Sequence, residues 1–254
     1  MHALVRRPSP RLAEGLVTHL ERSPVDVDLA IEQWETYVAA MRSVGWTTHE
    51  VDAAADCPDS VFVEDTMVVY RDLAVISRPG AHERRPETAE AEKAVSARGY
   101  RIAHIEAPGT LDGGDVLKHG NTVWAGEGGR TNAGGIAQLR ELLLPLGAEV
   151  VAVPVSKVLH LKSAVTALPD GTVIGHEPLV DDPTTWGARF LPVPEESGSH
   201  VVILDDHTLL MAASAPRTKA LFEKRGYIVV PVDISEFEKL EGCVTCLSVR
   251  LRGV

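Results

Sequence analysis

The sequence predicts a five-bladed α/β propeller made of repeated ββαβ units, and the prediction rests on internal repeats. Residues 122–153 and 201–232 share a succession of strand, turn, helix, glycine and strand. Residues 61–106 repeat the theme, and the Arg-Gly-Tyr at 98–100 that ends their helix has a counterpart at 225–227. Repeats of this size favour a radial or stacked architecture over an open sheet.

The remaining stretches complete the five units. Residues 163–193 resemble a degenerate copy with little or no helix, and the N-terminal stretch lacks one strand, which residues 247–251 can supply. The last unit is then closed by both chain ends. A doubly wound α/β sheet is the alternative, and the paired strands before each helix disfavour it. We expect strands at 3–6, 46–51, 66–70, 73–78, 122–125, 149–153, 201–204, 208–211 and 228–232. We expect one helix that residues 84–88 open and residues 98–100 end, and others near 27–43, 132–146 and 217–225.

The last two of these helices carry capping residues. Thr131 and Thr218 stand near their starts, and Gly147 and Gly226 follow their ends. A polar side chain at the start and a glycine just past the end are preferred in helices. We therefore expect the two threonines to open these helices.

Length and charge narrow the class of protein. A chain of 254 residues suits one large domain or two small ones, and we expect a single domain over residues 1–254. Its 25 basic and 36 acidic residues give a net charge of −11. This charge argues against a nucleic-acid partner and is compatible with a cationic small molecule.

The N-terminus and the cysteine content predict a cytoplasmic protein. Residues 1–8 contain no apolar core of a secretory signal, and no apolar run approaches the roughly 18 residues of a membrane helix. The three cysteines, Cys57, Cys243 and Cys246, are few and odd in number for a secreted protein held by disulfides.

Two loops concentrate acidic residues. In residues 58–65, Asp59 and the adjacent Glu64 and Asp65 flank an apolar segment that we expect to be a strand. The carboxylates indicate either a solvated turn or a site for a guanidinium, which presents five donors in a planar fork. Asp112 lies in an Asp-Gly-Gly-Asp segment, which forms either a tight turn or a backbone that a ligand can approach closely.

His160 and Cys246 complete the inventory of a cysteine hydrolase. Such an enzyme needs a thiolate nucleophile, a histidine that moves protons and an acid that orients the histidine. Taken singly, a histidine among apolar neighbours and a cysteine in an apolar segment are more often structural residues. The combination keeps the catalytic interpretation open.

Rival motifs are incomplete. Cys243-x-x-Cys246 could be a redox or zinc pair, but the chain has no second Cys-x-x-Cys and no His pair at zinc-finger spacing. The glycine-rich segment 126–131 lacks the third glycine of a dinucleotide site, and both a Walker loop and a Gly-x-Ser-x-Gly elbow are missing. We expect neither a metal nor a cofactor.

Together the segments resemble the dimethylarginine dimethylaminohydrolase family of the guanidino-group-modifying (pentein) superfamily. The matching segments follow the family's order and span most of the chain: 59–65, 77–80, 84–85, 111–115, 126–132, 159–163 and 242–248. The resemblance implies the same five-bladed propeller. It also implies hydrolysis of Nω-methylated arginines to citrulline and dimethylamine or methylamine, through a covalent thiouronium and without a cofactor.

The resemblance further implies a role for each site residue. Cys246 would be the nucleophile, His160 the general acid and base, and Asp112 the support of His160 and a contact of the guanidinium. The implied substrate-binding residues are Glu64 and Asp65 for the guanidinium, Asp59 for the α-amine, Arg84 and Arg130 for the α-carboxylate, Leu16 in a lid loop within residues 7–25, and Leu240 through a backbone contact.

The roles of Asp112 and Cys243 and three alternative functions stay open. Some relatives carry Glu at the position of Asp112, and Cys243 is not expected in the family; it is either inert or able to form a disulfide with Cys246. The chain could instead be an arginine deiminase or a hydrolase of another N-substituted arginine, a non-catalytic pentein that binds arginine-like ligands, or a redox protein that binds metal through its two nearby cysteines. A homodimer is compatible with the sequence.

Overall fold

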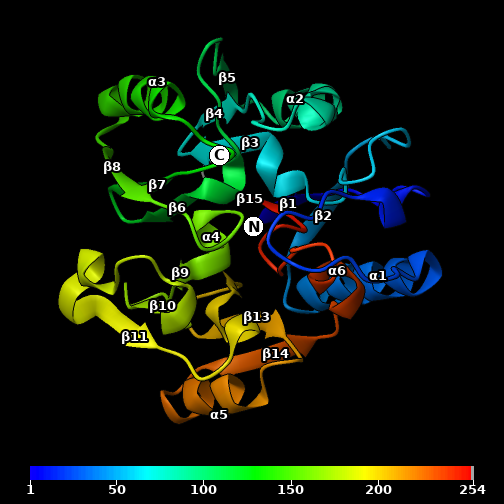
Figure 1. Ribbon diagram of the computed structural model, residues 1–254, viewed down its shortest axis with the longest axis vertical. Helices are drawn as coiled ribbons and strands as arrows, with labels where there is room; N and C mark the ends of the chain where they lie inside the picture. Colours follow the sequence, from blue (N-terminus) through cyan, green and yellow to red (C-terminus); the bar gives the residue numbers. More distant parts are fainter. Residues whose placement is uncertain (253–254) are drawn as a thin grey trace.

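Five three-stranded sheets surround a central axis in the computed structural model, which describes residues 1–252 (Figure 1). The sheets have the strand orders β15-β1-β2, β3-β4-β5, β6-β7-β8, β9-β10-β11 and β12-β13-β14. The strands are β1 (His2–Val5), β2 (Thr47–Glu50), β3 (Met67–Tyr70), β4 (Leu73–Ile76), β5 (Arg101–His104), β6 (Val116–His119), β7 (Thr122–Glu127), β8 (Glu149–Pro154), β9 (Val165–Ala167), β10 (Val173–Gly175), β11 (Phe190–Pro192), β12 (Val201–Ile203), β13 (Thr208–Ala212), β14 (Ile228–Val232) and β15 (Val249–Leu251).

The helices differ in length from one unit to the next. The α-helices are α1 (Val27–Ser43), α2 (Thr88–Ser96), α3 (Ala133–Leu143), α4 (Leu161–Ala164), α5 (Pro216–Lys224) and α6 (Ser235–Glu238). Short 3-10 helices span Leu12–Glu14, Val63–Thr66, His82–Glu87, Gly113–Asp115, Leu144–Leu146, Glu177–Leu179, Pro183–Arg189 and Glu196–Ser199. Between β10 and β11 the connection contains only 3-10 helices, as expected for the degenerate unit.

Every sheet repeats one hydrogen-bonding pattern. The first strand of each order given above pairs antiparallel with the middle strand, and the middle strand pairs parallel with the third. In one sheet the first strand is β15, from the C-terminal part of the chain, and Leu251 lies opposite His2 of β1. The prediction of five units, one of them closed by both chain ends, is therefore confirmed.

One edge strand of each sheet lies beside the central axis: β3, β6, β9, β12 or β15. Neighbouring inner strands contact each other, β15 with β3 and β6 with β9, and Figure 1 shows their labels grouped around the centre. The repeated pattern gives all five inner strands the same direction along the axis. The segments that precede these strands therefore meet at one end of the axis, and the strands' last residues meet at the other.

Helix α1 shows how the outer elements are held. The carboxylate of Asp26 accepts hydrogen bonds from the backbone N–H groups of Asp28 and Leu29, which would otherwise lack partners at the helix start. Tyr37 and Met41 are fully buried on its inner face, as an amphipathic helix packed on a core requires. The observed bounds match the helix predicted at 27–43.

The apolar segment within residues 58–65 is not a strand, so that prediction was wrong. The segment forms turns followed by the 3-10 helix Val63–Thr66, and the N–H of Phe62 and that of Asp65 each bond a carbonyl three residues earlier. In a strand, adjacent side chains would point to opposite faces. The tighter turn instead lets Glu64 and Asp65 both be buried beside the axis.

The predicted threonine caps were also wrong. Helix α3 is capped by Asn132, whose side chain accepts from the N–H of Gly135, and α5 begins at Pro216 without a side-chain cap. Proline suits the first helical position because its missing N–H would have no partner there. The hydroxyl of Thr131 donates to the buried Asp115 and that of Thr218 to the half-buried Glu195, so both threonines bind acids.

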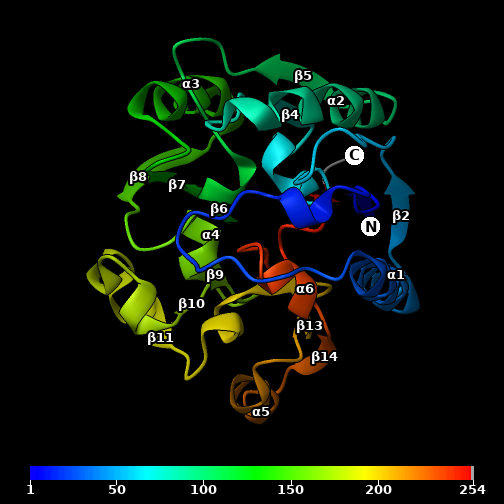
Figure 2. The ribbon, with the colours of Figure 1, turned by 45° about the vertical axis from the view of Figure 1, so that its right-hand side comes forward.

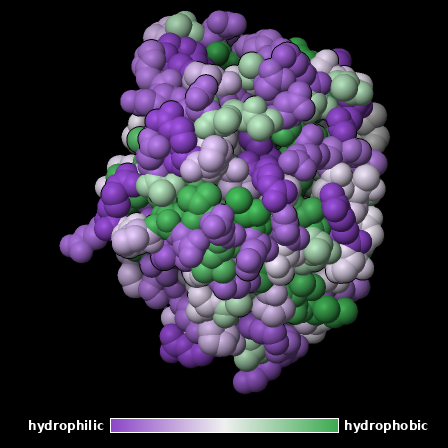
Figure 3. Space-filling view, turned by 90° about the vertical axis from the view of Figure 1, so that its right-hand side faces the viewer, coloured by the Kyte–Doolittle hydropathy of each residue, from purple (hydrophilic) through white to green (hydrophobic). Residues whose placement is uncertain are grey.

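Within residues 1–252, each helix is too short or too polar to cross a membrane. Figure 3 shows the face at the right of Figure 1, where hydrophilic residues predominate and hydrophobic ones form a broken band.

Candidate active site

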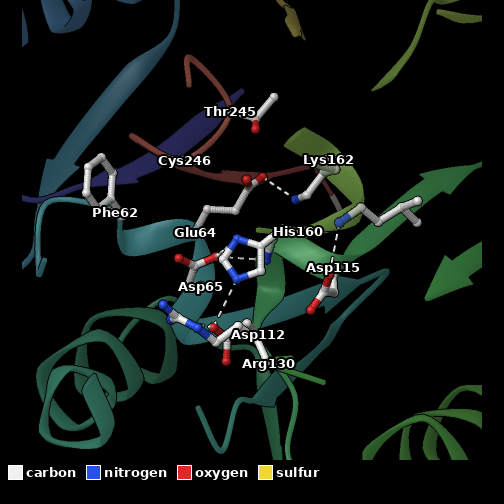
Figure 4. Close-up of polar contacts among 12 residues, drawn as sticks. Phe62, Glu64, Asp65, Asp112, Asp115, Arg130, His160, Lys162, Thr245 and Cys246 are labelled. Atoms are coloured by element: carbon white, nitrogen blue, oxygen red, sulfur yellow. Dashed lines mark hydrogen bonds and ion pairs between the residues drawn. The ribbon is translucent and has the colours of Figure 1, made fainter. Parts of the chain in front are cut away.

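Four of the predicted site residues come from segments that precede inner strands. Asp65 precedes β3, Asp112 precedes β6, His160 precedes β9 and Cys246 precedes β15. Because these strands share one direction around the axis, their leading segments converge at the same end (Figure 4). Sequence positions almost two hundred residues apart are thereby brought into one site.

A histidine lies between two carboxylates at the centre of this end. The Nε2 atom of His160 lies 3.0 Å from Oδ2 of Asp112, and its Nδ1 atom lies 3.8 Å from Oδ1 of Asp65. All three side chains are buried. The ring is thus oriented on one side by a hydrogen bond and faces a second acid on the other.

The surrounding acids keep this histidine charged. Burial alone would lower the pKa of His160, but Asp65, Asp115 and Asp112 outweigh it and raise the pKa to about 9. Burial likewise opposes the charged form of Asp65, yet His160 and Arg84 lower its pKa to about 2. Near neutral pH the centre therefore contains an imidazolium between carboxylates.

Asp115 supports the centre from behind, a role that sequence analysis missed. Its carboxylate accepts from the N–H of Leu161, beside His160, and from the hydroxyl of Thr131, which in turn accepts from the N–H of Asp112. Burial raises the pKa of Asp115 to about 6. The Asp-Gly-Gly-Asp segment contained the signal, since it holds both acids.

Glycine is required between these acids. A Cβ atom at Gly114 would lie 2.6 Å from Nδ1 of His160 and 2.5 Å from Oδ1 of Asp65. The backbone N–H of Gly114 donates to the same Asp65 oxygen at 2.9 Å. The close backbone approach that the segment allows is therefore used by the protein's own side chains.

Arg84 lines the site but is fully engaged. Its guanidinium bonds Asp65 at 2.5 Å and Glu87 at 2.8 Å, and it also donates to the carbonyls of Asp59 and Phe62. The nearby carboxylates hold the pKa of Arg84 well above its usual value despite burial, which opposes the charge. A direct contact between Arg84 and a substrate carboxylate stays a prediction, because it would need one of these bonds to open.

Arg130 differs from Arg84 in having a spare donor. Its Nη1 atom lies 3.6 Å from Oδ2 of Asp112 and is buried without a hydrogen-bond partner within residues 1–252. A buried unpaired donor is costly unless a ligand completes it. Arg130 is therefore the better placed of the two arginines to receive an anionic group.

Glu64 lies behind His160 and Asp65, on the side towards the interior of the propeller. Its Oε1 atom is shared by Lys162, at 2.5 Å, and by Arg250, and its Oε2 atom is buried without a hydrogen-bond partner among the described residues. Neither Lys162 nor Arg250 was predicted, although Lys162 lies only two positions after His160 in the sequence. The unpaired oxygen could accept a hydrogen bond from a guanidinium.

A loop closes the other side of the site. The backbone N–H of Leu16 donates to both carboxylate oxygens of Asp59 at 3.1 Å, and the N–H groups of Thr18 and His19 donate to Glu241. Figure 2 shows this segment, between β1 and α1, crossing in front of α4 and α6. It is placed as a lid would be, and Glu241, which sequence analysis missed, holds it.

These residues enclose one small cavity, which we call the site cavity. Eight of the ten predicted residues line it: Leu16, Asp59, Asp65, Arg84, Arg130, His160, Leu240 and Cys246. Glu64 and Asp112 lie behind this lining. The volume of this cavity is only about 10 Å³, about the room for one water, so a larger ligand would require the loop or side chains to move.

Cys246 has a second thiol beside it. The Sγ atoms of Cys243 and Cys246 are 3.2 Å apart, and both residues are buried. The two thiols titrate as a pair. The pKa for loss of the first proton is lowered, because the remaining S–H donates a hydrogen bond to the thiolate, and the pKa for loss of the second proton is raised, because that proton is held in this hydrogen bond. Only Cys246 lines the site cavity.

One set of residues has the spacing of metal ligands. Ligand atoms of Asp65, Asp112 and His160 lie within 4.8 Å of one another. A metal would need His160 to lose its proton, and the raised pKa of His160 opposes that loss. The geometry suits proton transfer better than cation binding.

A buried histidine, carboxylates and a cysteine thus meet at one end of the axis of a five-bladed propeller, which is the inventory of a cysteine hydrolase. No family model matches the chain. A dimethylarginine dimethylaminohydrolase from Streptomyces coelicolor is 68% identical and covers 98% of this chain and 96% of its own. One from Pseudomonas aeruginosa is 34% identical over 98% of each chain.

A solved structure gives the same result. The Pseudomonas aeruginosa dimethylarginine dimethylaminohydrolase in complex with citrulline superposes with a TM-score of 0.92, at 33% identity and over 98% of each chain. The chain belongs to the dimethylarginine dimethylaminohydrolase family.

Proposed function

We propose that the chain hydrolyses asymmetric dimethylarginine and monomethylarginine to citrulline and dimethylamine or methylamine, with Cys246 as nucleophile. The observation that carries the proposal is the convergence of Cys246, a charged His160 and Asp65 on one cavity that also contains the spare donor of Arg130. Family membership supports the same reaction. The citrulline held by the Pseudomonas relative corresponds to the expected product.

The acidic residues would bind the guanidinium. Asp65 lines the cavity with its carboxylate deprotonated, and the unpaired oxygen of Glu64 lies behind it. Carboxylates that bond the guanidinium nitrogens fix its plane, so that its central carbon faces the sulfur. At the other end, Arg130 would bond the α-carboxylate and Asp59 the α-amine, once Leu16 releases the carboxylate of Asp59.

In the first half of the reaction the Cys246 thiolate attacks the guanidinium carbon. The bound cation and the charged His160 favour the thiolate over the thiol. His160 then gives its proton to the departing dimethylamine as the C–N bond breaks. The products of this step are the free amine and a thiouronium joined to Cys246.

In the second half water attacks the same carbon. His160, now neutral, takes one proton from the water, the C–S bond breaks and the thiolate returns, while the second proton of the water leaves the new C–O group for solvent, where the released amine takes it up. One water is consumed for each citrulline and amine released. Asp112 keeps the ring in position in both halves through its 3.0 Å hydrogen bond.

Product analysis tests this proposal. Purified protein is incubated separately with arginine, monomethylarginine and asymmetric dimethylarginine, and citrulline and amines are measured by mass spectrometry. We expect citrulline and dimethylamine from the dimethylated substrate, loss of both in Cys246→Ser, and normal turnover in the matched control Cys57→Ser. Citrulline mainly from arginine would assign a deiminase instead, and no citrulline from any substrate would reject the proposed activity.

We also propose a cellular location and an oligomeric state for the enzyme. We place the enzyme in the cytoplasm, and its three free cysteines support this because a reducing compartment keeps thiols reduced. A homodimer is the assembly that the sequence allows. Sedimentation of the purified protein at several concentrations distinguishes the dimer from a monomer.

A further inference from the structure

A second, larger cavity lies at the far ends of the inner strands. Its volume is about 670 Å³, and it is lined by residues of all five inner strands. These residues include Tyr70 of β3, Lys118 of β6, Ala167 of β9, Ile203 of β12 and Arg250 of β15. We call it the rear cavity, since Glu64 separates it from the site cavity.

The lining of the rear cavity is strongly basic. Five cationic side chains line it, Arg71, Lys118, Lys162, Arg250 and Arg252, and no Asp or Glu of the described chain does so. The whole chain has a net charge of −11. Such a concentration of cations in a concave site of an acidic protein focuses a positive potential there.

Only two of these cations are paired with an acid. Lys162 and Arg250 share Glu64 in the wall between the cavities. Within residues 1–252 the other three form no ion pair. The Lys118 ammonium donates to the carbonyl of Val69 at 2.6 Å, Arg71 lies over the ring of Tyr70, and Arg252 donates to the carbonyl of Ile203 and lies over the ring of Trp46.

Lys118 responds both to desolvation and to the neighbouring cations. The side chain of Lys118 is exposed to the rear cavity, but the surrounding protein desolvates its ammonium, and this desolvation, followed by the charges of Lys162, Arg250 and Arg252, lowers the pKa of Lys118 to about 7, although Glu64 acts in the opposite direction. Its ammonium has three donors and gives one to Val69. An anion between these side chains would relieve the repulsion and raise the pKa of Lys118.

We propose that the rear cavity is a binding site for a small multivalent anion of the phosphate class, held by Lys118, Arg71 and Arg252. Guanidinium groups bond phosphate oxygens in pairs, and an ammonium adds a point charge. The volume admits a phosphate or a phosphate ester. The site is distinct from the site cavity, and its existence does not depend on the proposed hydrolysis.

Calorimetry with sulfate tests the site, because sulfate has the shape and charge of phosphate but does not titrate near neutral pH. Sodium sulfate is titrated into the full chain at pH 6.5 and at pH 8.5, with sodium chloride at matched ionic strength as reference. We expect saturable binding of one sulfate at pH 6.5 and an affinity at least about fivefold weaker at pH 8.5, where Lys118 has lost its proton. No saturable sulfate heat beyond that of chloride would overturn the proposal.

Variants locate the binding. Lys118→Met keeps the length of the side chain without its charge, and we expect it to weaken sulfate binding about tenfold or more and to remove most of the pH dependence. Arg71→Gln, on the exposed β3–β4 turn, should weaken binding without disturbing the interior. The control Lys93→Gln removes an equal charge from the surface of α2 and should bind like the wild type. Equal affinities in all four proteins would overturn the assignment.

Two further probes separate the sources of the anion. Inorganic phosphate represents a free anion, and glycerol 3-phosphate represents a phosphoryl group on a larger molecule. Tighter binding of the ester would assign a phosphorylated metabolite as the ligand, and equal binding would assign the free anion. In both cases Lys118→Met must weaken the binding of the probe. If the variant binds the probe as tightly as the wild type does, the ligand does not occupy the rear cavity.

Discussion

The Sγ atoms of Cys243 and Cys246 lie 3.2 Å apart in the turn that precedes β15. A disulfide needs the sulfurs to approach to about 2.05 Å, so they would have to move about 1 Å closer. The proposed nucleophile thus has a partner thiol that could remove it from the reaction.

Oxidation by hydrogen peroxide should inactivate the enzyme reversibly. Peroxide takes two electrons and two protons from the thiols, forms the Cys243–Cys246 disulfide and becomes two waters. We expect intact mass to fall by two hydrogens as activity is lost, and dithiothreitol to restore both. In Cys243→Ser the mass loss should disappear, whereas Cys57→Ser should behave like the wild type. An unchanged mass loss in Cys243→Ser would refute this disulfide.

The pH dependence of turnover should report His160. Its pKa of about 9 means that it is charged at neutral pH and becomes neutral as the pH rises through 9, when it can no longer protonate the departing amine. We expect kcat/KM to fall above about pH 9. Asp112→Asn removes one of the carboxylates that raise this pKa, so the descending limb should move to lower pH. Asp205→Asn, on an exposed turn, serves as control, and an unmoved limb in Asp112→Asn would contradict the assignment.

Arg130→Ala should affect binding more than chemistry. The unpaired Nη1 of Arg130 is free to bond a substrate carboxylate, which does not change during the reaction. Loss of a hydrogen bond to a charged group costs roughly 1.5–3 kcal/mol, which corresponds to about a 10- to 100-fold higher KM with kcat little changed. Steady-state kinetics measures kcat and KM separately, and the exposed Arg101→Ala serves as the control. A large fall in kcat at unchanged KM would place Arg130 in the chemical step instead.

Lys162→Met should destabilise the fold. It removes one of the two cations that share buried Glu64, and Arg250 remains. A buried charge that loses a partner costs roughly 3–5 kcal/mol, and the remaining arginine should reduce this to about 1–3 kcal/mol. Urea unfolding measures the free energy. Lys219→Met, which breaks the exposed pair with Glu223, should change it by less than about 0.5 kcal/mol, and an equal effect of both variants would refute the argument.

Local patterns in the sequence were sufficient for most of the elements, although not for the segment 58–65 or the helix caps, and for most of the site. Helix α1 was predicted near its observed bounds, and what holds it is local: its capping Asp26 and its buried apolar face act within a few residues of one another. The repeat of strand, helix and glycine defined five units. Short segments, read through the family resemblance, identified eight residues that line the site cavity.

Tertiary structure decided what depends on contacts between distant segments. The sequence does not show that Glu64 is shared by Lys162 and Arg250, that Arg84 is already saturated by Asp65 and Glu87, or that the cations of the rear cavity converge. Each of these contacts depends on the positions in space of the residues at the two ends of the five inner strands. Hydrophobic periodicity fixes a strand's buried face, but charge pairing and pKa values depend on distances of a few ångströms across the axis, and only the folded chain sets them.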